Sequence, residues 1–252
     1  MKVEADKIHS RIEPPYLTDS IPRLIEIGID KTCNLFCGSC RNSVCIESGE
    51  KKRKNEIIAQ QLLDSGWLSK TQTVLLGGQG EVFFSPVYEK LMYGTDGNRK
   101  TLDLRTNGTL FTQEKLTGLL QKYDRLKVIV SIDAARKETY DRLRRSNSPY
   151  TWDKLSCNLE MLSKARHEGK LLFFQINMCV QMLNFEEIPD FIKWGERLGV
   201  DKVYFTPIRN WGTYEKEEFS DISIFLKGKQ LKKEVQKLVD IYRSKTIVKF
   251  EF

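Results

Sequence analysis

The strand and loop that decide the fold lie at residues 24–40, which read LIEIGIDKTCNLFCGSC. The apolar run at 24–29 predicts a β-strand that continues directly into a loop with three cysteines. Cys33, Cys37 and Cys40 are so closely spaced that their thiolates are expected to converge on one inorganic centre. The spacing leaves two centres open: an iron–sulfur cube held by three thiolates, or structural zinc with Cys45 as the fourth ligand.

The composition argues against several other classes of protein. The chain has 252 residues, 40% hydrophobic and 30% charged, which is typical of a soluble globular protein. Only two histidines occur, His9 and His167, which disfavours a Ser-His-Asp hydrolase and a His-rich metal site. Three of the six cysteines fall within eight residues, whereas a disulfide framework would spread its cysteines through a short secreted chain. Because no apolar run approaches the roughly 18 residues of a membrane span, and the charged amino terminus is no secretory signal, we expect a cytoplasmic protein without membrane contact.

Further strands and helices are predicted to alternate along the chain, which indicates an α/β fold. We expect a partial (β/α)6 TIM-like barrel with parallel strands at residues 23–215, preceded by an arm at 1–22 and followed by a helix and possible edge strand within 216–252. A lysine-rich run at 50–54 is predicted to be a solvated loop. After the strand at 24–29, the predicted strands are 74–76, 102–106, 126–132, 171–180, 202–207 and the edge strand 247–252, and the predicted helices are 56–65, 86–93, 112–120, 152–167, 188–198 and 231–242.

Small and polar residues follow the predicted strands. In barrels of this kind the chemistry lies at the carboxyl ends of the strands, because the loops there meet at one mouth. A purely structural barrel would not need such residues at each of these ends. The set delivered there by strands two to four comprises Gly78, Gly80, Glu81, Asn107, Ser131 and Asp133.

Several segments together resemble the radical S-adenosylmethionine (radical SAM) superfamily. The Cys-x3-Cys-x2-Cys spacing at 33–40 resembles its signature, LGGQGE at 76–81 resembles its glycine-rich motif, and TNGT at 106–109 resembles the segment after its third strand. VSIDA at 130–134 and TYDRLR at 139–144 are similar to the subgroup that often carries a SPASM or twitch extension.

The resemblance implies that Cys33, Cys37 and Cys40 hold a [4Fe–4S] cluster whose fourth iron is chelated by S-adenosyl-L-methionine. One electron then cleaves that cofactor, and the resulting 5′-deoxyadenosyl radical abstracts hydrogen from a substrate, while the protein supplies positioning and shelter. Ser131 and Asp133 are expected to accept hydrogen bonds from the ribose. The full implied set of cofactor-binding residues is Phe36, Ser39, Gly78, Gly80, Glu81, Asn107, Ser131, Asp133 and Arg144.

Elementary chemistry suggests roles for the other members of this set. Gly78 and Gly80 lack a Cβ atom, so their backbone can approach the cofactor closely. Glu81 is expected either to fix the glycine-rich loop or to accept a hydrogen bond from the cofactor's ammonium group. A planar guanidinium can bind the methionine carboxylate in two-pronged fashion, which suits Arg144, with its neighbour Arg145 as the alternative.

The sequence leaves the substrate open. The resemblance implies a peptide or protein side chain as substrate, with a sugar, nucleotide or cofactor precursor as the alternative. No cysteine follows Cys179, so we expect the cysteine-rich carboxyl-terminal extension to be absent, degenerate or outside the given sequence, which weakens the peptide assignment. The formal charge of +7 would attract an acidic flavodoxin or ferredoxin that delivers the electron. The alternative from another class, a zinc-stabilised nucleic-acid-binding module, lacks the clustered basic and aromatic residues expected of one.

Overall fold

The computed structural model describes residues 21–149, 151–226 and 230–252, so most of the predicted arm at 1–22 lies outside the described residues. Within them, seven strands form one open sheet in chain order, and every neighbouring pair is parallel. The strands are β1 (Leu24–Ile27), β2 (Thr73–Leu76), β3 (Thr101–Thr106), β4 (Arg125–Ser131), β5 (Phe173–Val180), β6 (Lys202–Pro207) and β7 (Val248–Phe250).

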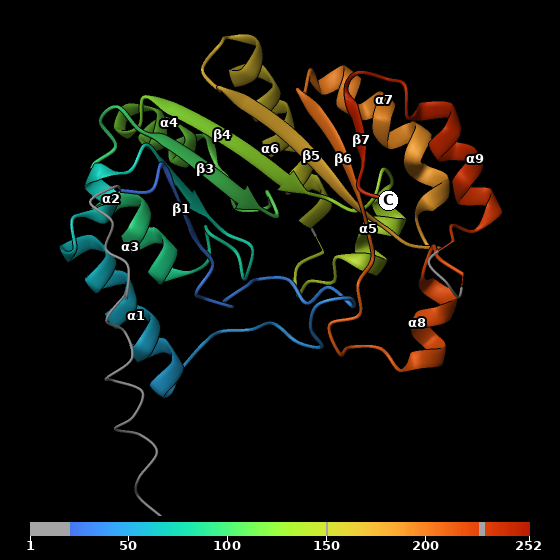
Figure 1. The fold of residues 1–252 in the computed structure, drawn as a ribbon, viewed down its shortest axis with the longest axis horizontal. Helices are drawn as coiled ribbons and strands as arrows, with labels where there is room; N and C mark the ends of the chain where they lie inside the picture. The colour runs from blue at the N-terminus through green and yellow to red at the C-terminus, as the bar shows by residue number, and fades with distance from the viewer. Residues whose placement is uncertain (1–20, 150, 227–229) are drawn as a thin grey trace, which may run out of the picture.

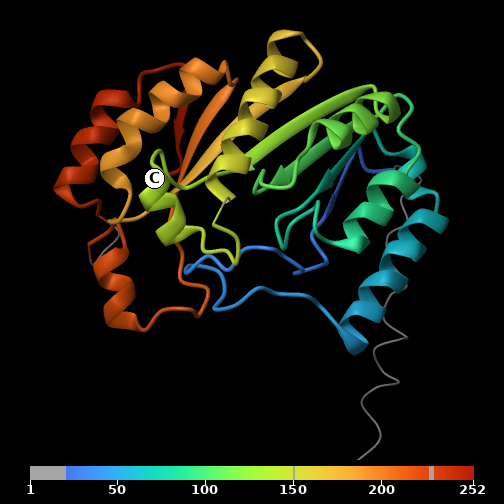
Figure 2. The same cartoon turned by 180° about the vertical axis from the view of Figure 1, so that it is seen from behind.

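Helices connect these strands and cover one face of the sheet, as the two opposite views in Figures 1 and 2 show. The predicted partial barrel with parallel strands is therefore confirmed, and the predicted edge strand is β7. The helices are α1 (Gly49–Asp64), α2 (Trp67–Lys70), α3 (Pro86–Gly94), α4 (Gln113–Lys122), α5 (Lys137–Leu143), α6 (Thr151–His167), the 3-10 helix η1 (Phe185–Glu187), α7 (Ile188–Leu198), α8 (Lys216–Ile222) and α9 (Lys233–Tyr242).

The core lies between the sheet and these helices. In-register pairing places Leu76, Leu104, Val128 and Phe174 in one row across four strands, and each is fully buried. Alternate residues of a strand point to opposite faces, so the neighbouring rows lie on the other side of the sheet. Each Å² of apolar surface removed from water stabilises the fold by about 25 cal/mol. Burial of these apolar side chains is therefore the main interaction that holds the sheet and helices together.

The opposite face of the sheet carries charged side chains among apolar ones. Register places Glu26 of β1, Asp103 of β3 and Lys127 of β4 in one row, with Leu75 of β2 between the first two. Arg105 lies two residues after Asp103 on the same face of β3, and its guanidinium pairs with the Glu26 carboxylate at 3.2 Å. The sheet therefore buries one face and presents charged groups on the other.

Helix ends follow the expected signals where the sequence supplies them. Ser85 and Thr112 accept hydrogen bonds from backbone N–H groups in the first turns of α3 and α4, and Pro86 is the first residue of α3. Gly199 ends α7 in the left-handed conformation at φ 65°. The strand at 202–207 is found with the predicted bounds.

One expectation about the surface is wrong. The lysine-rich run at 50–54 is not a loop, because α1 already begins at Gly49 and includes it. Its side chains are exposed, as predicted, and Lys52 pairs with Glu56 one turn later in the helix. Lysine, arginine and glutamate are good helix formers. The helix predicted from residue 56 therefore extends toward its amino terminus through this charged run.

None of the helices formed by residues 21–149, 151–226 and 230–252 has the length and apolar character that a membrane span requires.

Candidate functional site

The three cysteines lie in the segment between β1 and α1, which we call the cysteine loop (residues 28–48). Figure 1 shows it running below the carboxyl ends of the strands to α5 and back to α1. Leu35 pairs with Ser146, just after α5, in an antiparallel bridge, and Cys33 pairs with Cys45 in another. Thus the loop closes on itself and is also attached to the segment after α5.

A tight turn brings two of the cysteines together. The Cys37 carbonyl accepts hydrogen bonds from the backbone N–H groups of Cys40 at 2.9 Å and Arg41 at 3.0 Å. Cys33 and Cys37 are buried, whereas Cys40 is exposed, and all three are free thiols. Burial raises the pKa of the Cys33 thiol to about 11, and burial likewise raises that of Cys37 against the opposing charge of Arg144.

Each of these three sulfur atoms accepts a hydrogen bond. The Cys33 sulfur accepts one from the Leu35 N–H at 3.5 Å, and the Cys37 sulfur accepts one from Arg144 Nη1 at 3.7 Å. The Cys40 sulfur accepts two from Arg41, from Nε at 3.4 Å and Nη2 at 3.2 Å. Two guanidinium groups therefore stand beside the thiols, where they would stabilise thiolate charge.

The glycine-rich loop after β2 packs against the cysteine loop. A Cβ atom on Gly80 would lie 2.4 Å from the Asp30 carbonyl oxygen and 2.6 Å from that of Thr32, and Gly80 has a φ of +63°. Glu81 then donates its N–H to the Thr32 carbonyl at 2.8 Å. Gly78, by contrast, is exposed, and the nearest atom to a Cβ there would be Glu26 Oε1 at 3.9 Å. Gly80 thus serves close packing of two loops, whereas Gly78 leaves backbone accessible.

Glu81 links the loops after β2 and β3. Its carboxylate is buried and accepts hydrogen bonds from the Thr106 hydroxyl at 2.6 Å, the Asn107 N–H at 2.6 Å and the Phe83 N–H at 3.2 Å. Burial raises the pKa of Glu81, while these donors oppose that rise. These contacts connect the glycine-rich loop to the loop after β3.

Asn107 joins the loop after β3 to the cysteine loop. Its amide Nδ2 donates to Asn34 Oδ1 at 2.9 Å, and its Oδ1 accepts from both the N–H and the hydroxyl of Thr109. Asn34 Nδ2 in turn donates to the Thr109 hydroxyl at 3.0 Å. Sequence reasoning missed Asn34, although its position directly after Cys33 gave a hint.

The end of β4 carries a buried ion pair. Arg144 Nη2 lies 2.8 Å from Asp133 Oδ2, and both side chains are almost fully enclosed. Asp133 has a φ of +70°, uncommon for a residue other than glycine, and its Oδ1 accepts from the Cys179 N–H at 2.7 Å. Arg144 therefore joins Asp133 to Cys37, whereas Arg145 is exposed, with its guanidinium against Gly38.

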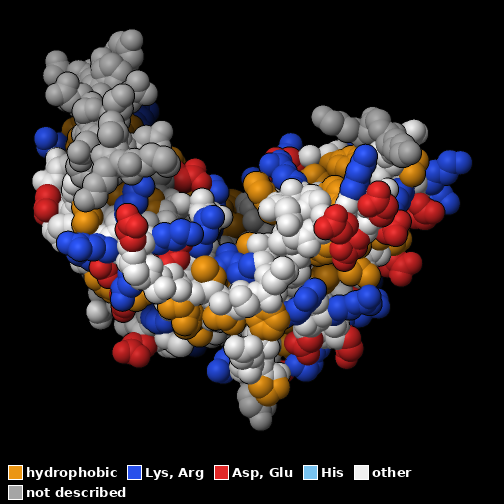
Figure 3. Space-filling model, turned by 90° about the horizontal axis from the view of Figure 1, so that it is seen from below, with side chains coloured by type: hydrophobic (Ala, Val, Ile, Leu, Met, Phe, Trp, Pro, Cys, Tyr) orange, Lys and Arg blue, Asp and Glu red, His pale blue; other side chains and the backbone are white. Residues whose placement is uncertain are grey.

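The other predicted residues lie around the same edge. Ser131 is half-buried at the end of β4, paired in register with Asn177. Phe36 and Ser39 are half-buried in the cysteine loop, where the Phe36 N–H donates to the Arg145 carbonyl. Figure 3, seen from the side on which the cysteine loop lies in Figure 1, shows a hollow between two lobes with Lys and Arg side chains beside it.

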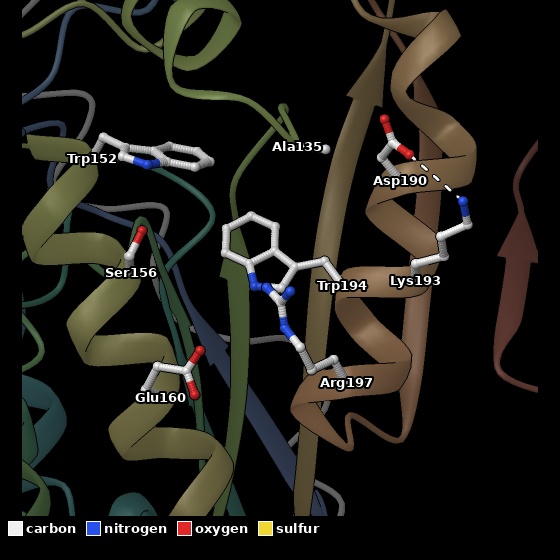
Figure 4. A pocket seen from close by; sticks show the side chains of 8 residues that line it. All are labelled: Ala135, Trp152, Ser156, Glu160, Asp190, Lys193, Trp194 and Arg197. Atoms are coloured by element: carbon white, nitrogen blue, oxygen red, sulfur yellow. Dashed lines mark ion pairs between the residues drawn. The ribbon is translucent and has the colours of Figure 1, made fainter.

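A separate groove of about 400 Å³ lies on the helical layer, between α6 and α7. Figure 4 shows the indoles of Trp152 and Trp194 on its walls, with Glu160 and Arg197 nearby. None of its lining residues belongs to the predicted site. The described residues contain no group of three or more His, Cys, Asp or Glu side chains arranged to hold a metal ion.

No family model matches this sequence, and no curated protein matches it. Solved structures do resemble the fold. SuiB of Streptococcus suis bound to precursor peptide SuiA aligns with a TM-score of 0.60 and 15% identity, covering 92% of this chain and 49% of that one. The structure of anSMEcpe with bound AdoMet (S-adenosylmethionine) aligns with a TM-score of 0.58 and 18% identity, covering 81% and 54%.

A third similar structure is TYW1 with a lysine-pyruvate adduct bound, at a TM-score of 0.54 and 18% identity, covering 78% of this chain and 68% of that one. At such identities the likeness establishes the fold. The chain spans about half the length of the SuiB and anSMEcpe chains.

Proposed function

We propose that this chain is a radical SAM enzyme in which Cys33, Cys37 and Cys40 hold a [4Fe–4S] cluster and the neighbouring strand ends hold S-adenosylmethionine. The observation that carries the proposal is the loop of three free thiols below the carboxyl ends of a parallel sheet, each sulfur accepting a hydrogen bond from an N–H donor. Two similar structures, SuiB and anSMEcpe, were solved with S-adenosylmethionine bound.

The types of donor suit the proposed groups, although the three thiols are not arranged around one metal position in the described residues. Thiolates are the ligands that iron–sulfur clusters take, and two guanidinium groups beside them balance negative charge. Within the described part of the chain, six buried side-chain polar atoms lack a hydrogen-bond partner, and three of them are Arg144 Nε, the Tyr140 hydroxyl and Gln181 Oε1. Buried polar atoms are normally paired, so these three invite a polar ligand.

The chain's own residues supply binding and orientation. When bound, the cluster supplies the electron that cleaves S-adenosylmethionine into methionine and a 5′-deoxyadenosyl radical. Glu81 and Asn107 fix the loops after β2 and β3 against the cysteine loop, and this pre-organises the cradle. The Arg144 guanidinium can bind the carboxylate of S-adenosylmethionine. That carboxylate would compete with the Asp133 carboxylate for the guanidinium.

We further propose a peptide or protein side chain as the substrate. SuiB has been solved with a precursor peptide, and anSMEcpe with Kp18Cys peptide, both on folds similar to this one. The open face of the sheet, with Glu26, Asp103, Arg105 and Lys127, offers charged groups for such a chain. A small acidic electron-transfer protein, a flavodoxin or ferredoxin, is the proposed partner, since the chain carries a net charge of +7.

Cluster loading in matched cysteine variants tests the site. After anaerobic reconstitution the wild-type chain should be brown with about four irons per chain. Cys37→Ser should lose most of that iron, whereas Cys157→Ser, which changes an exposed cysteine on α6, should keep it. A colourless wild-type protein, or equal iron in both variants, would contradict the proposed site.

A further inference from the structure

Arg41 supplies one of the two guanidinium groups beside the thiols, and its contacts indicate a role beyond the balance of charge. It directly follows the last cysteine of the loop, and its guanidinium donates to the Cys40 sulfur from both Nε and Nη2. The third guanidinium nitrogen, Nη1, donates to the Lys31 carbonyl at 2.6 Å. One planar group therefore holds the thiol from one side and the start of the loop from the other.

The charge of Arg41 acts on more than one thiol. Besides Cys40, it interacts electrostatically with Cys33 and Cys45. Arginine remains protonated in proteins, so this positive charge is permanent. Of Cys33, Cys37 and Cys40, only Cys40 is exposed. Without Arg41, water would supply the hydrogen bonds to the Cys40 sulfur.

The reduction potential of an iron–sulfur cluster depends on its net charge, on hydrogen bonds to its sulfur atoms and on its solvent exposure. Resting on the proposed function, we propose that Arg41 is a positioning residue that raises the reduction potential of the cluster through the Cys40 sulfur. When the cluster is reduced, it gains one electron from an external one-electron donor, and no bond forms or breaks. Reduction adds one negative charge beside the guanidinium, which therefore favours the reduced form.

The hydrogen bond from Arg41 to the Lys31 carbonyl suggests an alternative explanation, in which Arg41 has a purely structural role. If Arg41 only closed the loop, removing it would reduce the amount of cluster bound. The clusters that still assembled would then keep the wild-type potential. A potential measurement separates the two roles because it does not depend on how much cluster is present.

The experiment is a redox titration of the reconstituted protein, followed by electron paramagnetic resonance. Arg41→Gln should lower the midpoint potential, so that at a fixed potential the ratio of reduced to oxidised cluster falls roughly tenfold, which is about 59 mV for a one-electron couple. Arg41→Lys keeps the charge but not the planar pair of donors, and should fall between Gln and wild type. The control is Arg142→Gln, which removes an exposed arginine from α5 and should leave the potential unchanged.

The outcomes distinguish this inference from the function on which it rests. An Arg41→Gln cluster at the wild-type potential overturns the inference and leaves the proposed function standing. A shift of equal size in Arg142→Gln also overturns it, since a general loss of charge would then explain the effect. A wild-type chain that binds no iron overturns both.

Discussion

Replacing Glu81 by Gln should destabilise the fold at the site itself. The change keeps the size of the side chain and one oxygen, so the bonds from Thr106 and Phe83 can survive. In the wild-type chain, Glu81 Oε2 accepts a hydrogen bond from the Asn107 N–H at 2.6 Å. In the variant an NH2 group, which cannot accept this bond, takes the place of Oε2. A hydrogen bond to a charged group contributes about 1.5–3 kcal/mol, and an unpaired buried donor costs about 1–3 kcal/mol. We therefore expect a loss of about 3 kcal/mol in the free energy of unfolding.

Thermal and urea unfolding of the metal-free protein measure this loss. For a domain of this size about 3 kcal/mol corresponds to a fall in Tm of about 6–12 °C. Glu160→Gln, on the exposed side of α6, is the control and should stay within about 0.5 kcal/mol of wild type. If Glu81→Gln unfolds like this control, the carboxylate does not join the two loops and the account of the site is wrong.

Two further changes test the packing and the electrostatics of the fold. Gly80→Ala should cost more than the roughly 1–2 kcal/mol of a left-handed non-glycine residue, because its Cβ would lie 2.4 Å from the Asp30 carbonyl oxygen; an unchanged Tm would show that the two loops are not in contact. Burial raises the pKa of Asp201, but hydrogen bonds from Arg166 and the Phe174 N–H outweigh it and leave the pKa below the ordinary value. The stabilisation is therefore present above the unfolded pKa of about 3.9 and is lost as the pH falls through the lower folded value. Asp201→Asn should lose about 1 kcal/mol at neutral pH and show a weaker decline of stability below about pH 4, and an identical acid profile would refute this assignment.

The sequence was sufficient for the sheet because each strand carries its own apolar signal. The alternation at 126–132 belongs to a strand buried by helices on one face, and burial of that kind follows from the pattern alone. The short helices α2, α5 and α8 were missed because a helix of one or two turns has too few residues to form a stripe. In α5 only Tyr140 and Leu143 are buried, and α8 buries none.

The site was predicted by residue type but not by contact. Spacing singled out the cysteines, and the motifs singled out Glu81 and Arg144, yet no local pattern pairs Arg144 with Asp133 eleven residues earlier. Arg41 and Asn34 gave no signal beyond their position beside a cysteine. Asn34 contacts Asn107 and Thr109 from the loop after β3, which the sheet brings near, whereas Arg41 contacts Cys40 and Lys31 through the folded shape of its own loop.

Release of 5′-deoxyadenosine tests the central claim most directly. The anaerobically reconstituted chain is incubated with S-adenosylmethionine and a strong one-electron reductant, and the products are identified by mass spectrometry. We predict 5′-deoxyadenosine and methionine in equal amounts from the wild-type chain and from Cys157→Ser, and neither product above background from Cys37→Ser. An iron-loaded wild-type chain that releases no 5′-deoxyadenosine, or a Cys37→Ser chain that releases as much as wild type, would contradict the account.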